Sequence, residues 1–83
     1  MIVLISETTK VNGGHIIGHV VSRHRTVLAA VKARKNLQPA SGYIPTKIAQ
    51  EASGYSLSIG EYVDESEVID VDDDEIQDAY YML

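Results

Sequence analysis

The three histidines, His15, His19 and His24, are the side chains of this sequence best suited to bind a metal ion or to transfer a proton. If residues 14–21 form a strand, His15 and His19 lie about 13 Å apart along it, too far for both to bind one ion. His24 falls beyond the strand, in the first turn of a predicted helix. This spacing favours three surface histidines, and we expect no metal and no other cofactor.

No pattern of residues indicates catalysis. Most of the twelve acidic residues stand in one run in which every carboxylate has carboxylate neighbours, and no Ser or Thr has a recognisable nucleophile context. Gly13 and Gly14 lie in a predicted hairpin turn and not between a strand and a helix, so they do not form a phosphate-binding loop. We therefore expect a protein that is not an enzyme.

The length and composition indicate one folded domain, residues 1–83, with a thin core. Apolar residues make up 45% of the chain and charged residues 23%, which is ordinary globular usage. The absence of cysteine excludes disulfides and thiolate metal sites. No apolar run is long enough to span a membrane and no signal peptide is recognisable, so we expect a cytoplasmic protein that binds no membrane.

Positive charge gathers in the first half of the chain. Five of the seven Lys and Arg residues lie between positions 23 and 35, on and just before a predicted helix. Such a surface can contact nucleic-acid phosphates, or it can be the solvated face of a helix, where Lys and Arg are favourable. The residues of this basic surface are Arg23, Arg25, Lys32, Arg34 and Lys35.

Negative charge gathers near the other end, since ten of the twelve acids lie between positions 61 and 78. This segment is either a solvated end, or it pairs with the basic helix of the same or a second copy, or it contacts a basic surface of another protein. Interspersed Tyr62, Val63 and Val68 favour an ordered surface, and we favour contact with a partner protein. The predicted partner-binding residues are Asp64, Glu65, Glu67, Asp70, Asp72, Asp73, Asp74, Glu75 and Asp78.

One long helix, residues 22–38, carries the basic surface. Its apolar residues recur at steps of three and four and form one stripe that a sheet must cover. Ser22 and Thr26 are alternative N-caps, and Pro39 followed by Gly42 ends the helix.

A hairpin precedes this helix. Asn12 and Gly13 suit a type I′ turn, which places Glu7 opposite Gly18, Ile5 opposite Val20, Ser6 opposite His19 and Leu4 opposite Val21. One face of this hairpin is predicted to form the core under the helix. Its members are Val3, Ile5, Val11, Ile16 and Val20.

Shorter elements follow the helix. Residues 43–51 alternate weakly, and Pro45 places this strand at a sheet edge or delays its start until after the proline. A turn at 52–54 leads to a predicted strand at 55–59 with Tyr55, Leu57 and Ile59 inward, which resumes through Tyr62 and Val63. Val68, Ile69 and Val71 predict a short fifth strand.

The C-terminal residues 72–83 predict a short amphipathic helix. Four acids open it, which suits a helix N-terminus. Its apolar stripe consists of Ile76, Ala79, Tyr80 and Leu83.

These patterns together predict an α+β domain: a small, mainly antiparallel β-β-α-β-β sheet with one long helix on one face and a short C-terminal helix. We expect a non-catalytic interaction or inhibitory module that recognises a protein through charged surfaces. In size and charge it is similar to phage-borne inhibitors of host nucleic-acid machinery, although no motif carries that likeness. The alternative is a nucleic-acid-binding protein that uses the basic helix 22–38, and a homodimer is a third hypothesis.

Overall fold

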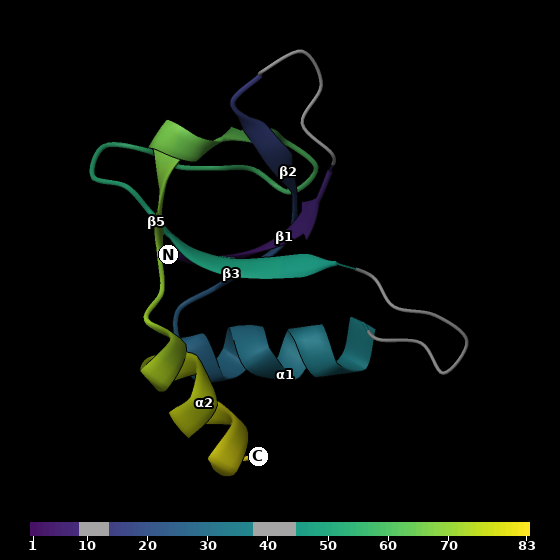
Figure 1. The fold of residues 1–83 in the computed structure, drawn as a ribbon, viewed down its shortest axis with the longest axis vertical. Coiled ribbons are helices and arrows are strands. Elements are labelled where there is room, and N and C mark those ends of the chain that lie inside the picture. The colour runs from purple at the N-terminus through teal and green to yellow at the C-terminus, as the bar shows by residue number, and fades with distance from the viewer. Residues whose placement is uncertain (9–13, 38–44) are drawn as a thin grey trace.

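The computed structural model describes residues 1–8, 14–37 and 45–83, which form an α+β fold in which two helices pack beside a five-stranded antiparallel sheet (Figure 1). The strands are β1 (Ile2–Glu7), β2 (Ile16–His24), β3 (Thr46–Glu51), β4 (Tyr62–Asp64) and β5 (Val68–Asp70). The helices are α1 (Val27–Leu37), the 3-10 helix η1 (Glu65–Glu67) and α2 (Asp73–Tyr81). The sheet order is β4-β2-β1-β3-β5. The predicted fold class is confirmed.

Strand β1 lies at the centre of the sheet, and its four consecutive apolar residues are buried. Alternate side chains of a strand point to opposite faces, so a run of this kind requires that both faces be covered. One face forms a helix-side core of Ile2, Leu4, Val27, Ala30, Val31, Ile48 and Ala79. The other face forms an inner core of Val3, Ile5, Val20, Ala49, Leu57 and Val63.

The prediction that Val3, Ile5 and Val20 lie under the helix was wrong. These residues do share a face, but it is the inner core, whereas α1 packs on Ile2 and Leu4. Because β1 is apolar at successive positions, its sequence does not indicate which face the helix covers.

The predicted hairpin register is confirmed near the turn and wrong further from it. Glu7 pairs with Gly18, Ser6 with His19 and Ile5 with Val20, as predicted. The register then shifts between Leu4 and Ile5, so Leu4 pairs with Ser22 and not with Val21. A bulge of this kind adds one residue to one strand and increases its twist. The Asn12 and Gly13 turn, together with Val11, lies outside the described residues.

A second irregularity at the start of β2 explains why Ile16 is not in the core. The pairing of β2 with β4 shifts between Ile16 and Gly18, leaving Ile16 exposed while Ile17 packs against the inner core. Gly18 is required here, because a Cβ at this position would lie 2.1 Å from the carbonyl oxygen of Ser6. The two strands approach too closely for any side chain at that point.

Helix α1 begins at Val27, later than the predicted range 22–38, and it uses the second of the two predicted N-caps. Thr26 is the N-cap, since its Oγ1 accepts a hydrogen bond from the Ala29 amide at 3.1 Å. Ser22 belongs to β2, and its Oγ lies in a hydrogen bond, 2.7 Å long, with Nε2 of His24. His24 therefore ends a strand and does not lie in a helical turn. The predicted stop at Pro39 and Gly42 lies outside the described residues.

Strand β3 begins directly after Pro45, one of the two predicted outcomes for a proline that cannot donate to a ladder. The turn at 52–54 is also confirmed: the Tyr55 amide donates to the Ala52 carbonyl, and Gly54 has a φ of 87°. The predicted strand at 55–59 was wrong. Only Leu57 is buried in this irregular segment, whereas Tyr55 and Ile59 are exposed.

The two edge strands β4 and β5 are separated by only the three residues of η1, although they stand at opposite ends of the sheet order. The sheet must therefore curl until its edges approach each other, and Figure 1 shows this ring of strands with both helices outside it. The inner core fills the ring, and the helix-side core lies between the ring and α1. The predicted short fifth strand is confirmed over Val68–Asp70, with Val71 just beyond its end, and the predicted C-terminal helix is confirmed as α2.

Candidate functional site

Helix α2 begins at a cluster of carboxylates. Asp72 is its N-cap, with Oδ1 accepting a hydrogen bond from the Asp74 amide at 3.1 Å. Asp73, Asp74 and Glu75 occupy the first turn, where negative charge is stabilised by the exposed backbone amides of the helix. These acids therefore stabilise helix α2, and they also make its N-terminal end negatively charged.

Helix α2 is held beside α1 by both apolar and polar contacts (Figure 1). Ala79 is buried in the helix-side core, and Ile76 packs against it. Arg34 of α1 donates from Nε to the Tyr80 hydroxyl at 2.8 Å, and its guanidinium carbon lies 5.3 Å from the centre of the Tyr80 ring. This pair combines a hydrogen bond with a cation–π contact. A helix of nine residues needs such packing, because it is too short to be stable alone.

Four exposed carboxylates remain on the solvent side of α2, and we call them the α2 acidic face: Asp73, Asp74, Glu75 and Asp78. In the part of the chain that the structure describes, none of the four forms an ion pair or accepts a hydrogen bond. Their negative charge is therefore directed to solvent or to another molecule. Tyr81 and Met82, at the end of the same helix, are 80% and 71% exposed.

The other predicted partner-binding acids are occupied within the chain. Asp64 and Glu67 form a capping box around η1: the Asp64 side chain accepts from the Ser66 amide, and Glu67 accepts from the Asp64 amide. Their carboxylates therefore maintain a local turn.

Two further acids of that set have basic partners. Glu65 Oε1 lies 3.0 Å from Nδ1 of His15, and Asp70 Oδ1 lies 2.6 Å from Nζ of Lys47. The structure thus separates the predicted acidic surface into an internally bonded part, which includes Asp72 as a cap, and the α2 acidic face.

The predicted basic surface is also divided. Arg23 is directed into the molecule, where its Nη2 lies 3.2 Å from both carboxylate oxygens of Glu51, and Arg34 is engaged with Tyr80. Arg25, Lys32 and Lys35 are exposed. Three of the five predicted cations are thus available to solvent, and they stand on or beside a helix that packs against acidic α2.

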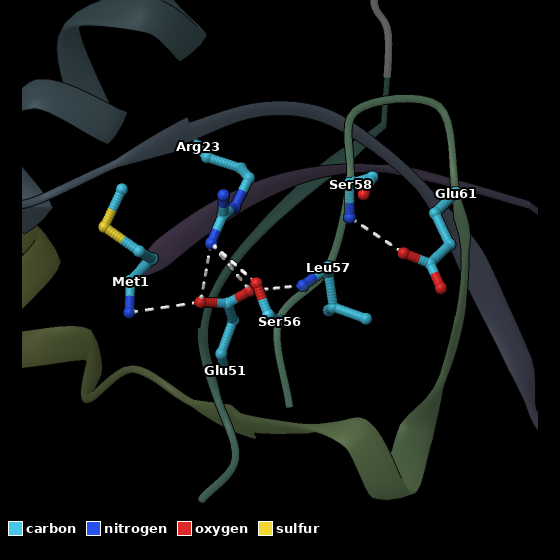
Figure 2. A network of polar contacts seen from close by, with 7 residues as sticks. All are labelled: Met1, Arg23, Glu51, Ser56, Leu57, Ser58 and Glu61. Atoms are coloured by element: carbon cyan, nitrogen blue, oxygen red, sulfur yellow. Dashed lines mark hydrogen bonds and ion pairs between the residues drawn. The ribbon is translucent and has the colours of Figure 1, made fainter. Parts of the chain in front are cut away.

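Glu51 is the residue that the sequence did not single out. It is buried, and its carboxylate accepts from the Leu57 amide, binds Nη2 of Arg23 and lies 3.3 Å from the amino group of Met1 (Figure 2). Arg23 also donates to Ser56 Oγ at 3.4 Å. We call this the Glu51 network. Residues two apart on a strand lie on the same face, so Glu51 shares a face with Ala49, and both are buried. This alternation was the one feature of the sequence that could have predicted that Glu51 is buried.

The Glu51 network is an electrostatic clamp on an irregular segment. Burial alone would raise the pKa of the Glu51 carboxyl, but the Leu57 amide, the Met1 amino group and the Arg23 guanidinium together lower it below its ordinary value of 4.5. The carboxyl is therefore ionised at neutral pH and keeps residue 57 in place, so that the Leu57 side chain enters the inner core. The Glu51 carboxylate therefore has a structural role, because its three donors all belong to this chain.

The histidines lie apart, each with a different neighbour. His15 meets Glu65, His19 packs edge-on against the Tyr62 ring at 6.4 Å between centroids, and His24 bonds Ser22. Burial lowers the pKa of His24, which favours its neutral form. No group of three or more potential metal-ligating side chains occurs among the described residues.

Comparisons of this chain with protein-family models, with curated protein sequences and with solved structures find no match. Within residues 1–8, 14–37 and 45–83, no helix has the length and apolar character needed to cross a membrane.

Proposed function

We propose that this protein is a non-catalytic interaction module that binds a basic surface of a partner protein through the α2 acidic face. The observation that supports this proposal most directly is the position of these four carboxylates. They are gathered on one docked helix, exposed, and without an ion pair to any described residue. Glu51, by contrast, is enclosed by donors of its own chain and is not available to a partner.

The partner class that we favour is a protein that normally binds nucleic acid, with inhibition as the outcome. Such proteins present clustered Lys and Arg side chains to phosphates, and a row of carboxylates competes for the same cations. Side chains one turn apart, such as Asp74 and Asp78, lie on the same side of a helix and can meet neighbouring cations. Exposed Tyr81 and Met82 add apolar contact area at the edge of the charged face.

The test is affinity capture from cells that naturally contain the protein, with the wild type and a neutralised variant side by side. The variant D73N/D74N/E75Q/D78N removes the α2 acidic face and keeps the Asp72 cap. We expect the wild type to retain a basic protein that added salt releases, and the variant to lose it. Retention of the same partner by the variant at low salt would contradict the proposal.

A matched control separates site from total charge. The variant Q50K/S53K/E61K raises the net charge by the same four units at exposed positions outside α2, and we expect it to retain the partner. Circular dichroism of both variants reports whether α2 has been lost. Equal loss of the partner in both would indicate a general charge effect instead of a defined contact.

Nucleic-acid binding by the basic helix is the competing function. The cations available for it are Arg25, Lys32 and Lys35, because Arg23 and Arg34 have partners within the chain. A gel-shift series with DNA and RNA at low salt distinguishes the two functions. Retardation that disappears in K32A/K35A and with added salt would favour the nucleic-acid function. Sedimentation over a range of concentration tests the homodimer in the same samples.

A further inference from the structure

A groove of about 730 Å³ lies at one end of the curled sheet, where β1 ends and β2 and β3 begin. Ile17 and Val68 in its wall pack against the inner core, and Ile69 beside them is 59% exposed. A smaller hollow of about 290 Å³ continues from it toward α2 and shares three of its residues. We call the two together the sheet-end groove. The residues common to both parts are Glu7, Lys47 and Asp70.

The groove follows a stretch of sheet edge to which no described strand is paired. Strand β5 pairs with β3 only at Ala49, Gln50 and Glu51, while β1 pairs with the other side of β3 from Thr46 onward. In Figure 1, β5 meets β3 near one end of that strand and then turns away to α2. The hydrogen bonds from the Glu7 amide to the Pro45 carbonyl and from the Glu51 amide to the Met1 carbonyl show that the odd-numbered residues of this stretch direct their backbone groups toward β1. Thr46 and Ile48, which line the smaller hollow, therefore present backbone groups on the β5 side without a strand neighbour in the described chain. An edge of this kind can pair with another extended chain.

The charge along the groove is negative on balance. Its acids are Glu7, Glu65, Asp70 and Asp73, against the two cations Arg34 and Lys47. Lys47 is paired with Asp70, and Arg34 is paired with Tyr80. Glu7 and Asp73 form no ion pair with a described residue, and they stand on β1 and α2, on different elements that border the groove. A positively charged occupant is therefore favoured over a negative one.

We propose that the sheet-end groove binds an extended peptide segment of the partner protein that carries lysine or arginine, and that this segment pairs with residues 46–48 of β3 as an added strand. The proposal rests on the proposed function, because it names a second contact of the same partner. Backbone pairing supplies affinity, apolar side chains of the segment cover Ile17 and Ile69, and a cation meets Glu7. The α2 acidic face is continuous with this groove through Asp73.

The test is an NMR titration of the full, ¹⁵N-labelled chain with a short capped peptide of alternating valine and lysine. We expect saturable shifts of the amides of residues 46–48 and of Glu7 and Thr8, together with slower hydrogen exchange at Thr46 and Ile48, whose amides face the open side. The same peptide with N-methyl groups on alternate backbone nitrogens keeps its charge but loses its donors. It should bind about tenfold more weakly. Equal binding of both peptides, or shifts confined to α2, would overturn the added-strand proposal.

Two matched pairs of variants locate the contact. Ile69→Ser should weaken peptide binding, whereas Ile59→Ser should not, because Ile59 is 69% exposed but lies outside the groove. Glu7→Gln should weaken binding about two- to fivefold at low salt, whereas Glu61→Gln should leave it unchanged, because Glu61 is exposed but lies outside the groove. If both members of a pair have the same effect, the groove is not the binding site.

Failure of this inference differs from failure of the proposed function. If the peptide does not bind, while D73N/D74N/E75Q/D78N releases the captured partner, the α2 contact stands and the groove contact is wrong. If the peptide binds in the groove, while that variant retains its partner, the groove contact stands and the role of α2 is wrong.

Discussion

Glu51 and the α2 acidic face carry the same chemical group in opposite surroundings. Glu51 is buried among three donors, which are the amino group of Met1, the guanidinium of Arg23 on β2 and the amide of Leu57 in the irregular segment after β3. The carboxylates of α2 are exposed and form no ion pair with the described residues. A buried carboxylate without partners would be too costly to keep, so its partners are part of the fold. An exposed carboxylate is stable without them.

This contrast separates structural charge from charge available for recognition. Removing Glu51 should unfold part of the molecule, and removing the α2 acidic face should change what the molecule binds. The clamp and the acidic face also lie on different elements, so variants in one can be made without altering the other. The expected effects below run from the largest to the smallest.

Glu51→Ala should have the largest effect on stability. It leaves the half-buried Arg23 guanidinium without its anion and the Leu57 amide without its acceptor, a loss of about 3–5 kcal/mol in the free energy of unfolding. Urea denaturation followed by circular dichroism measures it. Glu51→Gln keeps one acceptor oxygen and should lose less. A loss no greater than that of Glu75→Ala would remove the contrast between the two regions.

Leu57→Ala should destabilise the protein by about 3 kcal/mol, because the side chain is only 1% exposed in the inner core. Ile59→Ala is the control in the same irregular segment, since Ile59 is 69% exposed, and it should change stability by less than about 0.5 kcal/mol. Both are measured by urea denaturation. Similar losses for the two would mean that the Glu51 network does not direct residue 57 into the core.

Arg34→Ala should cost about 1–2 kcal/mol, because it removes the hydrogen bond and the cation–π contact with Tyr80. Hydrogen exchange of α2 amides should rise more than that of β1 amides, since this pair holds α2 rather than the sheet. Lys35→Ala, at the exposed neighbouring position, is the control and should have little effect. Unchanged exchange in α2 would show that apolar packing alone holds the helix.

Acidification should weaken the Glu51 network. The folded-state pKa of Glu51 lies below its ordinary value of 4.5, so its contribution to stability is present above about pH 4.5 and is lost as the pH falls through the folded pKa. Thermal melting between pH 6 and pH 3 measures this loss. In Glu51→Gln the melting temperature should fall less over the same range. An equal fall in both proteins would assign the acid sensitivity to other carboxyls.

Neutralising the α2 acidic face should have the smallest effect on stability and the largest on binding. D73N/D74N/E75Q/D78N breaks no ion pair among described residues. Each first-turn acid contributes about 0.3–1 kcal/mol at the helix N-terminus, but relief of repulsion among the four carboxylates offsets part of this, so the net loss should be about 1 kcal/mol. Urea denaturation and partner capture are measured on the same preparation. A loss of stability as large as that of Glu51→Ala would show that these acids are structural.

Local patterns predicted the elements that depend on near neighbours. The C-terminal helix was predicted correctly because its N-cap Asp72 and the acids of its first turn stabilise it through contacts within a few residues. The register from Glu7 to Ile5 follows from counting outward from one turn. The predicted strand at 55–59 failed because its alternation is satisfied by one buried residue, Leu57, whose place depends on a distant carboxylate.

The acidic character of the candidate site was predicted from the sequence, but not which of its acids face solvent. The sequence indicated an acidic surface over residues 61–78, yet nothing local distinguishes Asp64, which caps η1, from Asp74, which faces solvent. Asp70 likewise depends on Lys47, 23 positions away (70 − 47). Such pairings follow from which strands become neighbours.

The amino-acid sequence by itself determined the fold class, the sorting of charge along the chain and the presence of both helices, because these depend on composition and on short-range periodicity. The tertiary structure alone decided that α1 covers Ile2 and Leu4, that Glu51 meets Arg23, and that the sheet curls until β4 and β5 approach. Four successive apolar residues in β1 suit either face equally. Only the packing of segments far apart in the chain selects between the two faces, and the same packing leaves the carboxylates of α2 directed outward.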